Sequence, residues 1–186
     1  MLDIETLGTA PGSVILSIGA VRFSEGGLGD TFYTTIDIDS SQAAGLKISA
    51  PTLCWWLRQN TAALREITRG VHPLPNALKQ FSDWLCAHPL AGIWGNGSDF
   101  DNALLASAYD AIGVTPPWSH KVNRCYRTIR AANRNLNHMA TAKATGTAHH
   151  ALDDAKNQAL HLIAIWSNVE SSHGDRTETL TNTENE

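Results

Sequence analysis

A ten-residue run rich in β-branched and apolar residues at positions 14–23 constrains the fold more than any other feature of the sequence. Gly12 bounds this run on one side and a glycine pair at positions 26–27 bounds it on the other, which is typical of a buried strand. An alternating segment follows at residues 30–38, and a short segment that alternates apolar and acidic residues opens the chain at residues 2–5. The three segments predict an antiparallel meander.

After this meander the periodicity becomes helical, and strands and helices then alternate. Such alternation places helices on the faces of a mixed sheet. We therefore expect an α/β domain in which a mixed five-stranded sheet carries helices on both faces. The expected helices cover residues 51–67, 75–87, 100–112, 136–144 and 151–167, and the two further strands cover residues 90–94 and 122–126.

The composition fits one domain followed by a tail of different character. A chain of 186 residues with 42% hydrophobic residues can form one core, and it contains no repeat or long linker. Residues 168–186 carry five acidic side chains and one arginine, which accounts for the whole net charge of −4. Because this segment has few apolar residues, we expect a folded domain over residues 1–167 and an acidic, disordered tail over residues 168–186.

Three classes of protein are disfavoured by the same composition. No apolar run approaches the roughly 18 residues that a membrane span requires, and the first residues lack the pattern of a secretion signal. The three cysteines lie far apart and form no CxxC pair, which argues against a disulfide framework or a zinc ribbon. We expect a soluble, cytoplasmic protein with no membrane partner.

Acidic residues occur in closely spaced pairs at several places. Asp3 and Glu5 alternate on the opening strand, so their side chains share one face and repel each other. A hard cation such as Mg²⁺ or Mn²⁺ would relieve that repulsion, although an exposed strand edge has the same pattern. Asp99 and Asp101 follow the strand at residues 90–94, where open α/β sheets place their sites. This second pair also fits a helix cap and a first-turn acid.

A further cluster combines His149 and His150 with Asp153 and Asp154 in the first turn of the last helix. The helical periodicity places the two aspartates on either flank of the core-facing stripe, so it does not decide which of them faces a site. Zinc is disfavoured because no cysteine or third histidine stands at ligand spacing.

These acidic and histidine segments resemble the three exonuclease motifs of the DEDD superfamily, histidine subgroup, whose members have the ribonuclease-H-like fold. Two other segments resemble the branch that contains ribonuclease AS and exodeoxyribonuclease VIII. The resemblance covers residues 1–166, so residues 1–167 are the expected exonuclease domain. The motif-like segments are residues 3–6, 95–102 and 149–155, and the branch-like segments are residues 55–59 and 94–97.

The resemblance implies which member of each pair acts. It selects Asp101, which directly follows an aromatic residue, and leaves Asp99 as a cap; it also selects His149 and Asp154, which stand five positions apart. It further implies that two Mg²⁺ or Mn²⁺ ions are held by carboxylates and that His149 takes a proton from the attacking water. The implied metal ligands are Asp3, Glu5, Asp101 and Asp154. The implied activity is that of a 3′-to-5′ exonuclease, which releases nucleoside 5′-monophosphates from single-stranded nucleic acid.

Several residues are expected to contact the substrate. The backbone of Thr6 would hold the terminal nucleotide, and Leu7 would wedge against a base. Trp55 or Trp56 would stack on a base, but adjacent helical residues point apart, so at least one of them belongs to the core. Arg127 lies in a basic segment that fits either a phosphate track or a solvated face. The basic residues of this segment are Lys121, Arg124, Arg127, Arg130 and Arg134.

Some alternatives stay open at the level of the sequence. No residue distinguishes RNA from DNA, and the alternative functions are a catalytically poor nucleic-acid-binding module or an enzyme that trims short oligonucleotides or adenylated RNA ends. Only Met1 and Leu2 precede Asp3, so the first strand is short or translation begins upstream. Similarity to ribonuclease T and ribonuclease AS implies a homodimer.

Overall fold

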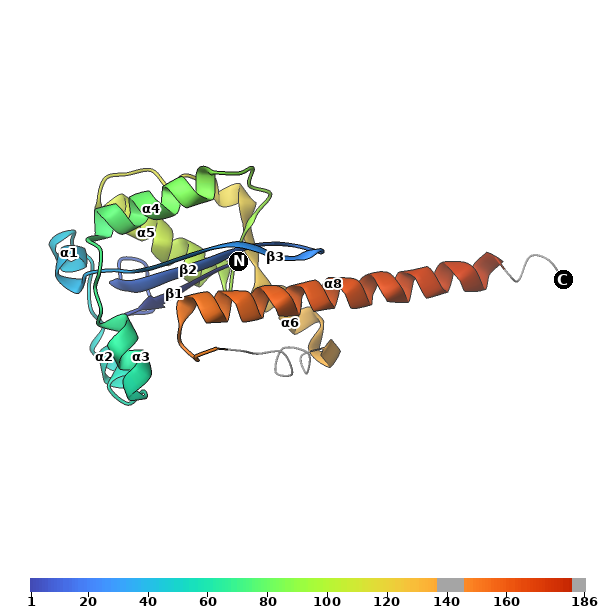
Figure 1. The fold of residues 1–186 in the computed structure, drawn as a ribbon, viewed down its shortest axis with the longest axis horizontal. Coiled ribbons are helices and arrows are strands. Elements are labelled where there is room, and N and C mark those ends of the chain that lie inside the picture. The colour runs from blue at the N-terminus through green and yellow to red at the C-terminus, as the bar shows by residue number, and fades with distance from the viewer. Residues whose placement is uncertain (137–145, 182–186) are drawn as a thin grey trace.

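The computed structural model describes residues 1–136 and 146–181, with side chains described as far as residue 168. Its strands form a three-stranded antiparallel sheet in the order β1-β2-β3 and a two-stranded parallel sheet of β4 and β5 (Figure 1). The strands are β1 (Leu2–Thr6), β2 (Ile15–Ser24), β3 (Gly27–Thr35), β4 (Ile93–Gly95) and β5 (Asn123–Cys125). The helices are α1 (Ile38–Ala43), α2 (Ala50–Trp56), α3 (Thr61–Ile67), α4 (Leu74–Cys86), α5 (Ala103–Ala111), α6 (Tyr126–Ala132) and α8 (Ala151–Thr181).

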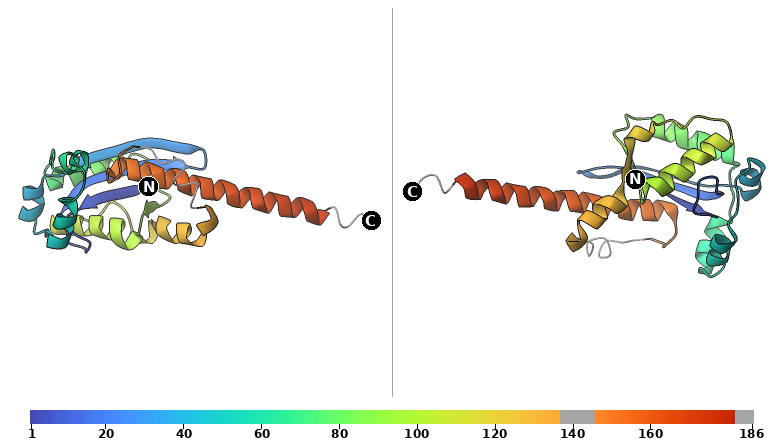
Figure 2. Two further views of the ribbon diagram at one scale, coloured as in Figure 1. Left: turned by 90° about the horizontal axis from the view of Figure 1, so that it is seen from below. Right: turned by 180° about the vertical axis from the view of Figure 1, so that it is seen from behind.

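Helices cover both faces of the three-stranded sheet, as the sequence predicted (Figures 1 and 2). Leu2 and Ile4 of β1 point to one face, where they join the main hydrophobic core with side chains of α4 and α5. Met1 and Val21 belong to a smaller cluster with Ala155 and other side chains of α8. Because side chains alternate along β1, Met1, Asp3 and Glu5 lie on the face that α8 covers.

The five expected strands are present, but the described residues pair them in two sheets, which corrects the prediction of one five-stranded sheet. Met1 and Val21 exchange backbone hydrogen bonds of 2.7 and 2.9 Å, so alternation along the ladder directs the Ile4 N–H toward β4. This N–H donates to the Asp101 carboxylate at 3.3 Å instead of to a backbone carbonyl. The Ile4 N–H, which could otherwise pair with a backbone carbonyl of β4 and join the two sheets, thus holds the Asp101 side chain.

The helix expected over residues 51–67 is divided into α2 and α3. The Asn60 side chain accepts a hydrogen bond of 2.9 Å from the backbone N–H of Ala63, which caps α3 and starts a new helix. The helix expected over residues 136–144 lies outside the described residues apart from Leu136, which belongs to the short 3₁₀ turn η3 (Arg134–Leu136).

The last helix does not end at Ser167 as predicted, because its backbone is helical to Thr181. Its second half extends away from the sheets in every view (Figures 1 and 2). The division of the chain at residue 167 stays a prediction. None of the described helices combines the length and the apolar character that crossing a membrane requires.

Candidate active site

Two carboxylates of the site come from β1 and a third comes from the first turn of α8. Asp3 pairs with Gly19 in the β1–β2 register. A Cβ atom at position 19 would overlap the backbone of Ala151 and Leu152, so glycine allows the start of α8 to lie directly against the sheet. This close approach brings Asp154 to the face that carries Asp3.

Asp101 comes from a π-helical turn, η1 (Ser98–Asn102), which follows β4. The sequence predicted an α-helix from residue 100, but residues 98–102 form this π-helical turn and α5 begins only at Ala103. Such π turns are frequent at functional sites. The Asp101 side chain is 2% exposed and accepts the hydrogen bond from Ile4. A Cβ atom on Gly95 would approach Asp101 within 3.0 Å, so a glycine at the end of β4 leaves room for the carboxylate. Asp99, by contrast, is exposed.

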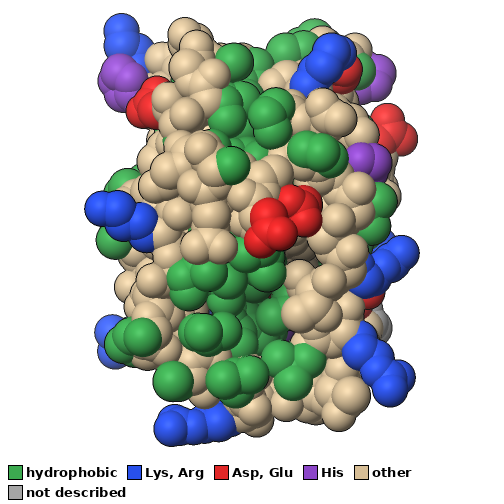
Figure 3. Space-filling model, turned by 90° about the vertical axis from the view of Figure 1, so that its left-hand side faces the viewer, with side chains coloured by type: hydrophobic (Ala, Val, Ile, Leu, Met, Phe, Trp, Pro, Cys, Tyr) green, Lys and Arg blue, Asp and Glu red, His purple; other side chains and the backbone are tan. Residues whose placement is uncertain are grey.

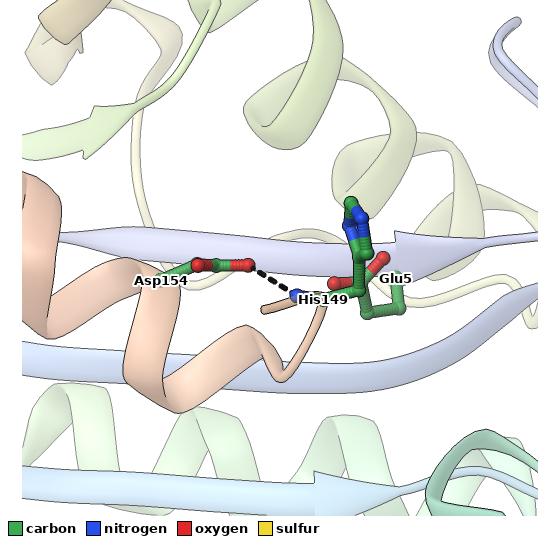
Figure 4. Close-up of side chains that lie close together, drawn as sticks. All are labelled: Glu5, His149 and Asp154. Atoms are coloured by element: carbon green, nitrogen blue, oxygen red, sulfur yellow. Dashed lines mark hydrogen bonds between the residues drawn. The ribbon is translucent and has the colours of Figure 1, made fainter. Parts of the chain in front are cut away.

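His149 lies just before α8 and has a left-handed backbone with φ of 62°. Its backbone N–H donates a 3.0 Å hydrogen bond to Oδ2 of Asp154 (Figure 4). Its ring packs edge-to-face against Trp55 and Trp56, with centroid distances of 5.0 and 6.0 Å. Potential ligand atoms of Glu5, His149 and Asp154 all lie within 4.8 Å of one another.

These side chains line one cleft of about 450 Å³. The cleft contains all of the residues that the sequence proposed as metal ligands or catalytic base, although they come from three distant segments of the chain. Arg127 and Arg130 of α6 also line it. The proposed chemical residues in the cleft are Asp3, Glu5, Asp101, His149 and Asp154.

The cleft disfavours negative charge in the absence of a cation. Burial raises the pKa of Asp3 well above its usual range, and Asp101 and Glu5 raise it further. Burial also raises the pKa of Glu5 from 4.5 to about 8, with added repulsion from Asp154 and Asp101. Burial raises the pKa of Asp101 to about 7 and outweighs the hydrogen bond from Ile4, and burial likewise raises the pKa of Asp154.

The donor set fits a divalent cation. The carboxylate oxygens are ligands of the kind that Mg²⁺ and Mn²⁺ prefer. Oδ2 of Asp101 is buried and has no hydrogen-bond partner among the described residues. A buried carboxylate oxygen without a partner is costly unless a cation reaches it. The residues present therefore suit Mg²⁺ or Mn²⁺.

Gln158 is a site residue that the sequence interpretation missed. Its Nε2 donates a 2.7 Å hydrogen bond to Oδ1 of Asp3, and its Oε1 has no partner in the described part of the chain. It follows Asp154 by four positions on α8, so both lie on one helical face. That spacing was a usable signal, but an amide carries no charge to draw attention to it.

Leu7 and Trp56, two of the residues proposed to contact substrate, have side chains that lie in the core, and for the tryptophan pair one core member was expected. Leu7 is 3% exposed and belongs to the main core, so it does not form a wedge. Trp56 is 2% exposed, and its Nε1 donates a 2.8 Å hydrogen bond to the Thr6 carbonyl. Thr6 is itself buried, with its hydroxyl donating to the carbonyl of Gly8.

Trp55 is the member of the tryptophan pair that faces solvent, with 41% of its surface exposed. Leu53 and Leu57 are exposed nearby in the chain. Figure 3 shows the left-hand side of the view in Figure 1, and hydrophobic side chains gather over the lower part of it, where α2 and α3 lie. Trp55 therefore packs against His149 and still exposes part of its surface to solvent.

The basic segment does not form one track. Arg127 lines the cleft and donates a 2.6 Å hydrogen bond to the carbonyl of Asn96, and Arg130 lines it one helical turn further on. Arg124 instead donates to the carbonyl of Lys121 at 3.0 Å and lines a different cavity. The change from β5 to α6 inside the segment separates the two groups.

Comparisons with known proteins agree with this geometry. Residues 1–166 match the family described as the 3′-5′ exoribonuclease Rv2179c-like domain. The structure is similar to the nuclease domain of 3′hExo, a DEDDh family member solved with bound rAMP, with a TM-score of 0.60 and 17% identity over 90% of each chain. No curated protein matches the chain. The structural similarity shows the ribonuclease-H-like fold of the DEDDh nucleases, and the family match shows the activity. The chain thus belongs to the 3′-5′ exoribonuclease Rv2179c-like family, and it has the fold of a DEDDh nuclease domain.

Proposed function

We propose that this exonuclease is metal-dependent and removes nucleoside 5′-monophosphates one at a time from the 3′ end of single-stranded RNA. The observation that carries the proposal is the convergence of His149 and the acidic side chains of β1, η1 and α8 around one cleft. Buried carboxylates would repel a phosphate backbone unless cations lay between them. A module that only binds nucleic acid has no use for such a cleft.

The carboxylates of the cleft would hold two divalent cations. When bound, such cations stabilise negative charge on the phosphate and lower the pKa of water. Burial, together with neighbouring carboxylates, raises the pKa values of Asp3 and Glu5, and this supports the assignment. The unpartnered Oδ2 of Asp101 supports it as well. The proposed ligands are Asp3, Glu5, Asp101 and Asp154.

His149 is the proposed general base, because a neutral imidazole can accept a proton and this one lies beside Glu5 and Asp154. The hydrogen bond from its backbone to Asp154 fixes the turn, and the tryptophan rings restrict its imidazole. The base is thus oriented before substrate arrives. Its role is to accept a proton from the attacking water.

The cationic side of the cleft is proposed to hold the substrate strand. Arg127 and Arg130 would pair with phosphates, and the exposed face of Trp55 would stack on a base. Stacking requires an unpaired base, which favours a single strand. A homodimer and a cytoplasmic location stay predictions.

The test uses matched single-stranded RNA and DNA oligonucleotides that carry a label at the 5′ end. We expect a ladder that shortens from the 3′ end with Mg²⁺ or Mn²⁺, faster for RNA, and no ladder in EDTA. Asp101→Asn should abolish the ladder, whereas Asp99→Asn, at the neighbouring exposed acid, should leave it intact. Cleavage that persists in EDTA, or equal loss in both variants, would contradict the proposed site.

A further inference from the structure

His150 and Asp153 stand beside the two proposed chemical residues in the sequence, yet neither lines the cleft. They are half-buried and contact each other. Nδ1 of His150 lies 3.4 Å from the backbone N–H nitrogen of Asp153 and 3.5 Å from its Oδ2. The Asp153 carboxylate also accepts a 2.9 Å hydrogen bond from the backbone N–H of Thr147. The pair therefore ties both ends of the turn that contains His149.

Tyr33 of β3 supports this pair from the sheet. Its ring stacks on the His150 imidazole, with centroids 4.4 Å apart and planes inclined by 27°. The Tyr33 hydroxyl donates a 2.8 Å hydrogen bond to Glu66 of α3, so the ring is held at its far end too. The turn is thereby fastened to a strand and, through that strand, to a second helix.

The turn needs such support because of the backbone of His149. A φ of 62° is unfavourable for a residue other than glycine, because the Cβ atom crowds the backbone. Such a conformation persists only where the surroundings fix it. The hydrogen bond from His149 to Asp154 is one restraint, but that carboxylate is also a proposed metal ligand. A second restraint on the side away from the cleft would hold the turn independently of the cation.

We propose that Tyr33, His150 and Asp153 form a positioning clamp that holds His149 in its left-handed conformation and so directs its imidazole into the cleft. The clamp acts through His149 and does not touch substrate. The proposal rests on the proposed function only in its kinetic consequence, because the geometry of the turn is measurable without activity.

A double-mutant cycle separates positioning from general damage. His150→Ala is expected to lower kcat on the order of 10- to 100-fold with little change in KM, because a misplaced catalytic group costs up to about 10²-fold. In a His149→Ala background the same substitution should change the rate by less than about twofold, because the residue it positions is gone. The exposed His88 gives the matched control, and His88→Ala should have no effect in either background. The clamp would be overturned if His150→Ala lowered kcat equally in both backgrounds, or if it did not lower kcat in the wild-type background.

Tyr33 supplies a second test that avoids removing the imidazole. Tyr33→Phe keeps the stacked ring and should retain most of kcat, whereas Tyr33→Leu removes the ring and should reproduce the loss seen in His150→Ala. If Tyr33→Leu retains kcat, the sheet does not support the turn and the clamp is wrong.

A structural readout makes the inference independent of nuclease activity. NMR of the metal-free protein should show the strong intraresidue cross-peak between HN and Hα that a positive φ produces at His149, and His150→Ala should weaken it. If the wild type proves inactive but the variant still loses this signal, the clamp stands and the proposed function fails. If the signal is unchanged in His150→Ala, the clamp fails whatever the activity.

Discussion

The two ends of β1 border cavities of opposite character. The cleft at the Glu5 end measures about 450 Å³ and is lined by acids, arginines and a histidine. The cavity at the Met1 end is larger, about 690 Å³, and its walls are mainly apolar and aromatic side chains with two arginines. The larger cavity lacks the clustered acids of the smaller one. Size alone would select the wrong end, whereas the chemistry of the lining selects the cleft.

The contrast extends to how each end treats buried charge. Burial raises the pKa of Glu5 to about 8 at one end, and at the other end burial and the nearby Arg22 lower the pKa of the Met1 amine from 8.0 to about 5. Both groups are therefore pushed toward their neutral forms. Only the acidic end gathers several carboxylates, which is what a site for cations requires.

The largest expected difference between the two ends is in activity. Asp154→Asn keeps an oxygen that can accept the N–H of His149 but removes a charge that the cleft concentrates. We expect kcat to fall by about 10²–10³-fold, as when one electrostatic stabiliser of a transition state is removed. Release of labelled nucleotide measures this loss. A variant that keeps more than a tenth of the activity would show that the two ends differ less than their linings indicate.

The apolar end should show the reverse pattern, with an effect on stability and not on catalysis. Trp166 stacks on Phe23 with centroids 5.7 Å apart and packs edge-on against Trp94 at 5.9 Å. Trp166→Ala should lower the free energy of unfolding by about 2–3 kcal/mol, somewhat less than a fully buried tryptophan would cost. Urea denaturation measures this change. The folded variant should keep kcat within about twofold, and a larger loss would link the two ends.

The local parts of this comparison were predictable from the sequence. The apolar run of β2 and the alternation in β1 depend on near neighbours only, so the strands and the shared face of Asp3 and Glu5 could be inferred. The choice of Asp101 and His149 came from the resemblance of motifs and not from periodicity. The structure places both of them in the cleft.

The parts that depend on distant contacts could not be predicted. Nothing near Ile4 indicates that its N–H will serve Asp101 and leave the two sheets unjoined. Leu7 follows a motif and is apolar, and only the surrounding core shows that it is buried. The clamp on His149 likewise depends on Tyr33, which lies on another strand and has no special pattern around it.

The smallest expected effect is a difference in the sign of pH dependence. Glu5 and Asp101 have folded pKa values of about 8 and 7, above the unfolded values of 4.5 and 3.8, so the folded state binds more protons between these limits. Their contribution to stability is complete below the unfolded pKa values and is lost as the pH rises through the folded ones. In EDTA, the melting temperature should therefore fall as the pH rises from 5 to 8. Added Mg²⁺ should raise it more at pH 8 than at pH 6.

The amine at the other end of the strand contributes with the opposite sign. Because its folded pKa is about 5 and its unfolded pKa is 8.0, the unfolded state binds more protons in that window, and this contribution grows as the pH rises. Glu5→Gln should flatten the fall in melting temperature. Acetylation of Met1, which keeps an N–H for the bond to Val21, should raise the melting temperature at pH 6 and have no effect at pH 9, where the amine is neutral in both states. The thermal scans thus assign one slope to each end of β1: Glu5→Gln should make the fall in melting temperature with pH shallower, and acetylation of Met1 should make it steeper. If both changes altered the slope in the same direction, the cleft would not be where the carboxylates bind their excess protons.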